Sequence, residues 1–144
     1  MTTRCPNSRK DREYDYEAAP RVREALHGPL QSFDLGTEVA RLREEKAWQE
    51  GRRNAITLRK GEGLNVVLLV MKEGDRLEEH SAPGPITLSV HEGRIRFSAA
   101  DEDVEAEAGT VLACDAGVRH SVEALGEAVC LLNVATGNGR RGLG

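Results

Sequence analysis

Two kinds of hydrophobic spacing divide the chain, and the change between them falls near residue 53. Before this point, Leu35, Val39 and Leu42 recur at helical spacing with glutamate and arginine between them. Asp34 precedes the stripe as an N-cap and Gly51 follows it as a C′ residue. The pattern therefore predicts one amphipathic helix of about four turns. A stripe of this kind usually packs on its own domain, and we expect Trp48 to anchor it there.

After residue 53 the pattern changes to short β-rich runs separated by glycine, proline and acidic turns. Residues 66–71 are apolar enough to be buried on both faces of a sheet. The turns recur at short, regular intervals, which is typical of an antiparallel barrel or a double-sheet jelly roll. The predicted strands are residues 54–60, 64–72, 75–80, 86–91, 94–98, 104–106, 110–114, 118–124 and 128–135.

These patterns divide the 144 residues into four segments around a single core. Residues 1–20 show no apolar period and are expected to form a disordered arm, and residues 21–52 form the helical segment. Residues 53–136 form the barrel. Residues 137–144 contain four glycines and two arginines and are expected to form a disordered tail.

Charge and cysteine usage limit the partners of the chain. The net charge of −4, with both signs interspersed, leaves no basic face for a nucleic-acid backbone. No apolar run is long enough to span a membrane, and the first residues lack the apolar region of a signal peptide. The three cysteines are widely spaced, which argues against a disulfide framework or a zinc knuckle. We expect a cytoplasmic protein that binds neither nucleic acid nor membrane.

Two glycine and histidine frames lie within the predicted barrel. They consist of Gly74, His80 and Gly93, followed by Gly109, Gly117 and His120. Their spacing resembles the two cupin motifs, G-x5-H-x-H-x3-4-E-x6-G and G-x5-P-x-G-x2-H-x3-N, over about residues 55 to 136. The resemblance implies an all-β fold, a cupin-type double-stranded β-helix or jelly-roll barrel, preceded here by the amphipathic helix. It also implies a homodimer and a small molecule bound in the mouth of the barrel.

The departures from the cupin motifs fall on the metal ligands. Cupins with a complete site hold a divalent metal on three histidines and one glutamate, and this chain retains two of the histidines, His80 and His120. Ala82 stands in place of the missing histidine and Ile86 in place of the glutamate. Two imidazoles alone make a poor site for zinc or non-haem iron, which need at least a third protein ligand.

Glu78 is the carboxylate that would best replace the missing ligand. Side chains alternate across a strand, so Glu78 is expected to share a face with His80. The candidate metal ligands are therefore His80, His120 and Glu78, and the candidate ions are iron, manganese, nickel and zinc. The same alternation directs His91 away from the interior, where we interpret it as a surface residue.

The cysteines of the barrel are predicted to differ in their surroundings. Cys130 lies in an apolar run and is expected in the core. Cys114 is close in sequence to His120, so it is either a small core residue or a thiol beside the site.

Three functions follow from these features. The first is a small-molecule-binding or sensor module with an incomplete metal site, because two metal ligands are replaced. The second is a divalent-metal-dependent cupin enzyme, a dioxygenase or isomerase, that uses His80 and His120. The third is a structural dimer module in which the helix at residues 34–50 carries the interaction. The sequence favours the first.

Overall fold

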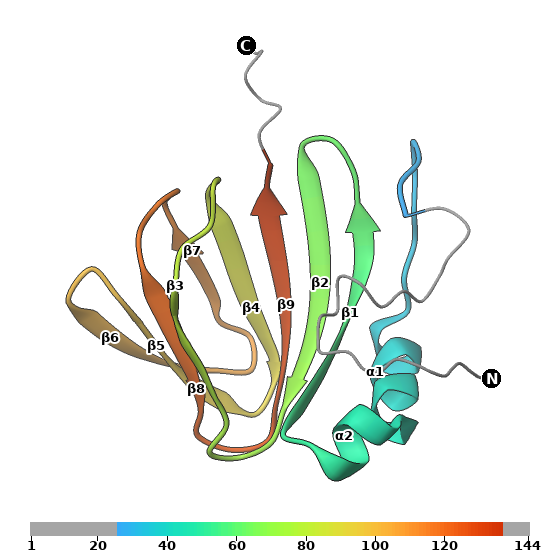
Figure 1. Ribbon diagram of the computed structural model, residues 1–144, viewed down its shortest axis with the longest axis horizontal. Coiled ribbons are helices and arrows are strands. Elements are labelled where there is room, and N and C mark those ends of the chain that lie inside the picture. Colours follow the sequence, from blue (N-terminus) through green and yellow to red (C-terminus); the bar gives the residue numbers. More distant parts are fainter. Residues whose placement is uncertain (1–25, 137–144) are drawn as a thin grey trace.

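Residues 26–136 are the part of the chain that the computed structural model describes, and their nine strands form two antiparallel sheets (Figure 1). The strands are β1 (Arg53–Lys60), β2 (Leu64–Met71), β3 (Arg76–His80), β4 (Ile86–Glu92), β5 (Arg94–Ala99), β6 (Glu102–Glu107), β7 (Val111–Cys114), β8 (His120–Ala124) and β9 (Ala128–Ala135). Each predicted strand is present, with ends that differ by a residue or two. The arm at residues 1–20 and the tail at residues 137–144 lie outside the described residues.

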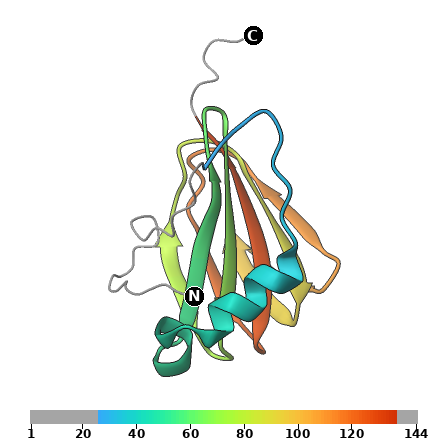
Figure 2. The same ribbon diagram turned by 90° about the vertical axis from the view of Figure 1, so that its right-hand side faces the viewer.

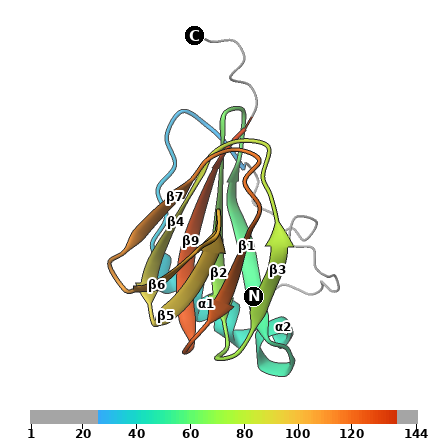
Figure 3. The same ribbon diagram turned by 90° about the vertical axis from the view of Figure 1, so that its left-hand side faces the viewer.

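The two sheets pack face to face as a jelly roll, which confirms the predicted fold class (Figures 1 and 3). Sheet A has the order β1-β2-β9-β4-β7, and sheet B has the order β3-β8-β5-β6. The interior between them is filled by side chains from both sheets. Its buried members are Leu69, Met71, Ile86, Leu88, Val90, Ile95, Phe97, Ala106, Val122, Ala124, Ala128 and Cys130.

Two helices cover the outer face of sheet A, α1 (Leu35–Glu44) and α2 (Lys46–Glu50) (Figure 2). Asp34 caps α1, because its Oδ1 atom accepts a hydrogen bond of 3.0 Å from the backbone N–H of Thr37. Among the described residues, neither of these helices has the length and apolar character that crossing a membrane requires.

The prediction of one continuous helix is wrong, because Glu45 has extended backbone angles and separates α1 from α2. The Nδ2 atom of Asn54, on β1, donates hydrogen bonds to the Leu42 carbonyl (2.9 Å) and to Oε1 of Glu45 (3.0 Å). The strand side chain thus satisfies a carbonyl at the end of α1, where helical hydrogen bonds run out. Gly51 is also extended rather than left-handed, so it is not the predicted C′ residue.

A second apolar cluster joins the helices to sheet A. Val39, Leu42 and Trp48 pack against the outward side chains of the sheet, which are Ile56, Leu58, Leu68, Val70 and Val129. The Trp48 side chain is buried, with the Lys72 Nζ atom 4.9 Å from its ring centroid. The predicted anchor role of Trp48 is confirmed, and the apolar stripe of the helix is buried within its own domain. The structural dimer hypothesis therefore loses the apolar face on which it depended.

The outer face of sheet B carries a ladder of ion pairs instead of a helical layer. Glu123 on β8 lies between Arg76 on β3 (3.6 Å) and Arg96 on β5 (3.0 Å). Glu105 on β6 pairs with Arg96 (3.2 Å) and with Arg94 (2.8 Å). The hydrogen bond that Arg96 donates to Glu105 is the main cause that raises the pKa of Arg96. These arginines therefore face solvent and acidic partners, while the opposite face of the same strands is apolar.

Gly93, which closes the first glycine and histidine frame, provides a test of the fold. It has a φ angle of +79°, and a Cβ atom there would collide with the backbone carbonyl of Glu127. Gly63 has a φ angle of +89°, but a Cβ atom added there would meet no other atom within 4 Å. We expect Gly63→Ala to lower the free energy of unfolding by about 1–2 kcal/mol through backbone strain alone. Gly93→Ala should cost clearly more, and equal losses in urea denaturation would contradict the close approach of the two backbones.

Candidate functional site

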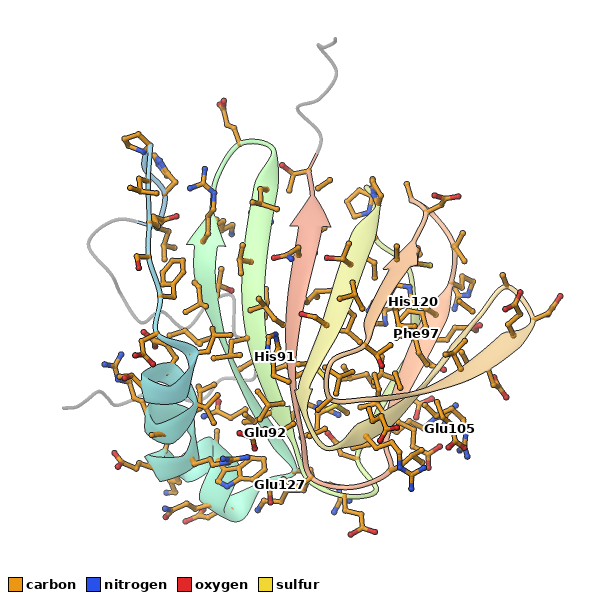
Figure 4. The ribbon with its side chains drawn as sticks, turned by 180° about the vertical axis from the view of Figure 1, so that it is seen from behind. His91, Glu92, Phe97, Glu105, His120 and Glu127 are labelled. Atoms are coloured by element: carbon orange, nitrogen blue, oxygen red, sulfur yellow. The ribbon has the colours of Figure 1, made fainter. Side chains whose placement is uncertain are left out.

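The structure brings His80 and His120 together from neighbouring strands. They are direct partners in the antiparallel pair of β3 and β8. Their ring centroids are 4.3 Å apart with an interplanar angle of 62°, an edge-to-face arrangement. Phe97 on β5 stacks on the other side, with its ring centroid 5.4 Å from that of His120 and an interplanar angle of 12°. Phe97 and His120 lie together in Figure 4, whereas His91 lies apart from them.

A β-bulge in β3 turns the exposed His80 side chain toward His120. Leu77 pairs with Val122 and His80 pairs with His120, so three steps along β3 match two steps along β8. Leu77 packs on the interior cluster. Because the bulge adds one residue to β3, His80 lies on the same face of the strand as Leu77, although the two are three residues apart. The bulge breaks the alternation that the sequence analysis assumed for this strand.

Glu78 is not brought to the histidine pair. Its side chain is 80% exposed, and its Oε1 atom lies 3.5 Å from Nε of Arg76. The expectation that Glu78 shares a face with His80 is therefore wrong, and the bulge is the physical reason. Glu79, the other carboxylate of the bulge, pairs with Arg119 at 3.2 Å.

Backbone hydrogen bonds set the tautomer of both imidazoles. Nδ1 of His80 lies 2.9 Å from the Glu78 carbonyl oxygen, and Nδ1 of His120 lies 3.1 Å from the Val118 carbonyl oxygen. A carbonyl oxygen can only accept, so each Nδ1 must carry the proton that it donates. In the neutral ring this leaves the lone pair on Nε2, which is then able to accept a hydrogen bond or bind a cation.

Solvent reaches some inward-facing side chains at the end of the barrel where β3 ends and β8 begins, which we call the open end. Figure 1 shows these two strand ends. Along β5 and β9, the inward-facing side chains become more exposed toward this end. On β9, Cys130 is fully buried, but Leu132 and Val134 are only partly buried. On β5, Ile95 is fully buried and Ala99 is only partly buried. Water therefore reaches inward-facing positions beside the histidine pair.

Asn65 is a residue of the open end that the sequence analysis missed. It is the second residue of β2 and pairs with Val134 of β9, which packs on the interior cluster. Along β2 it alternates in phase with Leu69 and Met71, so it faces the interior with them. Its Oδ1 atom is buried and has no hydrogen-bond partner within residues 26–136. The signal was present in the sequence, because Asn65 is the polar residue of the apolar run Leu64–Met71.

The electrostatics of the site follow from burial. His120 is only 5% exposed, and burial lowers its pKa, with a smaller contribution from His80 and an opposing one from the hydrogen bond to Val118. Burial also raises the pKa of Cys130 to about 12, so this thiol is an inert core residue, as predicted. Cys114 is partly buried and packs on the interior cluster opposite Ile86.

The donor set does not fit the divalent metal site that the resemblance implies. Within residues 26–136, no group of three or more histidine, cysteine, aspartate or glutamate side chains is arranged to hold a metal ion. Ala82 and Ile86, at the positions of the missing ligands, pack in the apolar interior. His91 is on the outward face of β4, where its Nε2 atom lies 3.1 Å from Oγ of Ser89, so its predicted direction is confirmed.

Comparison with known proteins agrees with the jelly-roll fold. The family model described as a cupin domain matches residues 67–135. A conserved protein of unknown function from Streptococcus pyogenes is similar in structure, with a TM-score of 0.60, 17% identity, and coverage of 85% of this chain and 99% of that chain. A cupin-2 domain protein from Shewanella frigidimarina has a TM-score of 0.58 at 13% identity, covering 72% of this chain and 94% of that one.

A larger enzyme is also similar in structure. Salicylate 1,2-dioxygenase from Pseudoaminobacter salicylatoxidans has a TM-score of 0.66 at 14% identity, with coverage of 78% of this chain but 35% of the enzyme. At this identity the likeness shows a shared fold. No protein with a curated function matches this sequence significantly.

The lowered pKa of His120 predicts how stability depends on pH. Between the native pKa and the ordinary value of about 6.5, the unfolded chain binds a proton that the native ring does not. The contribution is therefore fully present above about pH 6.5 and is lost as the pH falls through the native pKa. Urea denaturation at several pH values should show a shallower acid loss for His120→Gln than for wild type, while His27→Gln, at an exposed position, should match wild type. A titration midpoint of the His120 ring at or above 6.5 would contradict this account.

Proposed function

The chain belongs to the cupin superfamily, and from this premise we propose that it is a binding or sensor module for a small molecule, with an incomplete metal site. The observation that carries the proposal is the open end of the interior. Inward-facing side chains there are reached by solvent, and two imidazoles present their Nε2 atoms beside them. A concave, largely apolar site with a few convergent polar groups is the usual setting for a small ligand.

The absence of further metal donors among the described residues supports binding over metal catalysis. A ligand that enters the open end meets hydrocarbon from Ala82 and Ile86 where a complete cupin site would offer an imidazole and a carboxylate. The Nε2 atoms of His80 and His120 are then free to hydrogen-bond the ligand directly. Phe97 restrains the His120 ring by stacking on it, which lowers the entropy cost of presenting that atom.

The rival function is a divalent-metal-dependent cupin enzyme of the dioxygenase or isomerase type. One observation favours it, because the tautomer set by the backbone carbonyls leaves both Nε2 atoms in the form that binds metals. The fold shared with salicylate 1,2-dioxygenase is compatible with either function, since one fold hosts many activities. A homodimer, which the resemblance to cupins implies, and a cytoplasmic location, which the sequence led us to expect, complete the proposal.

Metal content distinguishes the two functions. After the purified full chain is incubated with iron, manganese, nickel and zinc and then desalted, we expect far less than one equivalent of metal. Two imidazole ligands give too few bonds to retain an ion. The measurement is elemental analysis of wild type and His120→Ala. One equivalent of metal in wild type that disappears in His120→Ala would establish the rival function instead.

Ligand binding at the pair can be followed through the histidine ring resonances. In a screen of small uncharged and charged fragments, we expect hits to shift the Cε1–Hε1 signals of His80 and His120 and leave those of His27 and His91 in place. His120→Ala should raise the Kd of a hit by about tenfold, the value of one lost hydrogen bond. His91→Ala is the matched control and should bind normally, because its ring faces outward. A screen without hits at the pair would overturn the proposed function.

A further inference from the structure

The buried Oδ1 atom of Asn65 is a polar group that the described residues leave without a partner. Such groups are rare in native proteins, because a buried acceptor that lost its water hydrogen bonds and gained none is destabilising. The position lies in an otherwise apolar strand, Leu64–Met71, where a leucine or valine would fit the pattern of its neighbours. An amide retained at this position therefore calls for a function that its hydrogen bonding would serve.

Asn65 and the histidine pair belong to the same end of the interior. β2 begins, β3 ends and β8 begins at that end of the molecule (Figure 1). The row of direct strand partners that contains Asn65 in sheet A continues through Val134, Ile86 and Cys114. The corresponding row in sheet B contains His80, His120 and Ala99. The polar atoms that these two rows offer to a ligand are three acceptors, Asn65 Oδ1 and the two Nε2 atoms, and one donor group, the Nδ2 amide of Asn65.

The charged side chains around this set of acceptors are paired with each other or exposed. The carboxylates nearest in sequence, Glu78 and Glu79, form ion pairs with Arg76 and Arg119 and are largely exposed. Lys60 is the basic residue in the Asn65 row, and it is exposed on the edge strand β1.

We propose that the open end binds an uncharged molecule with an apolar body and at least two hydroxyl groups, and that Asn65 is one of the residues that recognise it. This inference rests on the proposed function and specifies its ligand class. The hydroxyl groups donate to Asn65 Oδ1 and to an Nε2 atom of the pair, and the hydrocarbon body contacts side chains such as Val134 and Ala99.

The same chemistry selects against charged ligands. A carboxylate ligand would bring further acceptors to a set of three acceptors, because both Nδ1 protons are donated to backbone carbonyls and the Nδ2 amide of Asn65 is the donor that remains in the two rows. An ammonium ligand would find acceptors but no carboxylate to compensate its desolvation, since Glu78 and Glu79 pair elsewhere. Discrimination of this kind depends on leaving the wrong ligand with unpaired polar groups.

Substitution of Asn65 separates a recognition role from a structural one. Asn65→Leu removes the orphaned acceptor and extends the apolar strand, so its melting temperature should equal or exceed that of wild type. Its affinity for a dihydroxy ligand should fall at least tenfold. Asn65→Val, with a β-branched side chain, is a second variant that suits a strand.

Asn133 supplies the matched control because it is an asparagine on the outward face of β9. Its Nδ2 atom donates to Oγ1 of Thr87 at 3.2 Å. Asn133→Val should therefore lower the melting temperature and leave ligand affinity unchanged, the opposite pattern to Asn65→Leu.

The probes are resorcinol, benzoate and benzylammonium, which share one aromatic body and differ in their polar groups. Binding is measured by calorimetry and by the ring signals of His80 and His120. We expect resorcinol to bind at least tenfold more tightly than either ion, with this preference lost in Asn65→Leu. Resorcinol affinity that is unchanged in both Asn65 variants would overturn the role of Asn65.

The outcomes also separate this inference from the proposed function. Tighter binding of benzoate or benzylammonium at the histidine pair would overturn the ligand class while supporting a binding module. If that benzoate binding is lost in Lys60→Gln, the edge lysine defines an anion site. No response to resorcinol, together with fragment hits at the pair, would overturn the inference alone. No response to any fragment would overturn both.

Discussion

The pairing of β3 with β8 is the interaction on which the candidate site depends. It sets His80 opposite His120, and the bulge between Leu77 and His80 turns the exposed His80 ring against the buried His120 ring. Without the extra residue, strict alternation would place His80 on the opposite face from Leu77, among the arginine and glutamate side chains of the outer ladder. A bulge beside a functional site is a common way to redirect one side chain while the rest of the strand keeps its register.

Sheet A contributes the rest of the site because it is covered on both faces. Its outward side chains pack against α1 and α2, and its inward side chains meet sheet B. This two-sided burial explains why β2 is almost entirely apolar and why Asn65 is conspicuous within it. The fully buried end of the interior supports the fold, while the open end, with its partly exposed side chains, is where a ligand could enter.

The incomplete metal site and the two available imidazole acceptors involve the same residues, His80 and His120. In a complete cupin site the Nε2 atoms would be occupied by an ion. Here the backbone carbonyls of Glu78 and Val118 hold the rings in the same tautomer, so the lone pairs remain available to another donor. The proposed ligand class follows from this chemistry together with the unpaired amide oxygen of Asn65.

Local patterns in the sequence were enough to predict the strands, the turns at Gly74 and Gly93, the core position of Cys130 and the outward direction of His91. These features depend on side-chain alternation and on backbone angles that glycine adopts readily, so neighbouring residues determine them. The direction of Glu78, the break at Glu45 and the unpaired state of Asn65 were decided by the tertiary structure. The direction of Glu78 depends on the register between β3 and β8, and the break at Glu45 depends on the side-chain amide of Asn54. The unpaired Asn65 Oδ1 atom depends on the strands beside β2, whose side chains donate no hydrogen bond to it. The sequence of one protein does not show which strand residues pair with each other, because the register is set only when the sheets assemble.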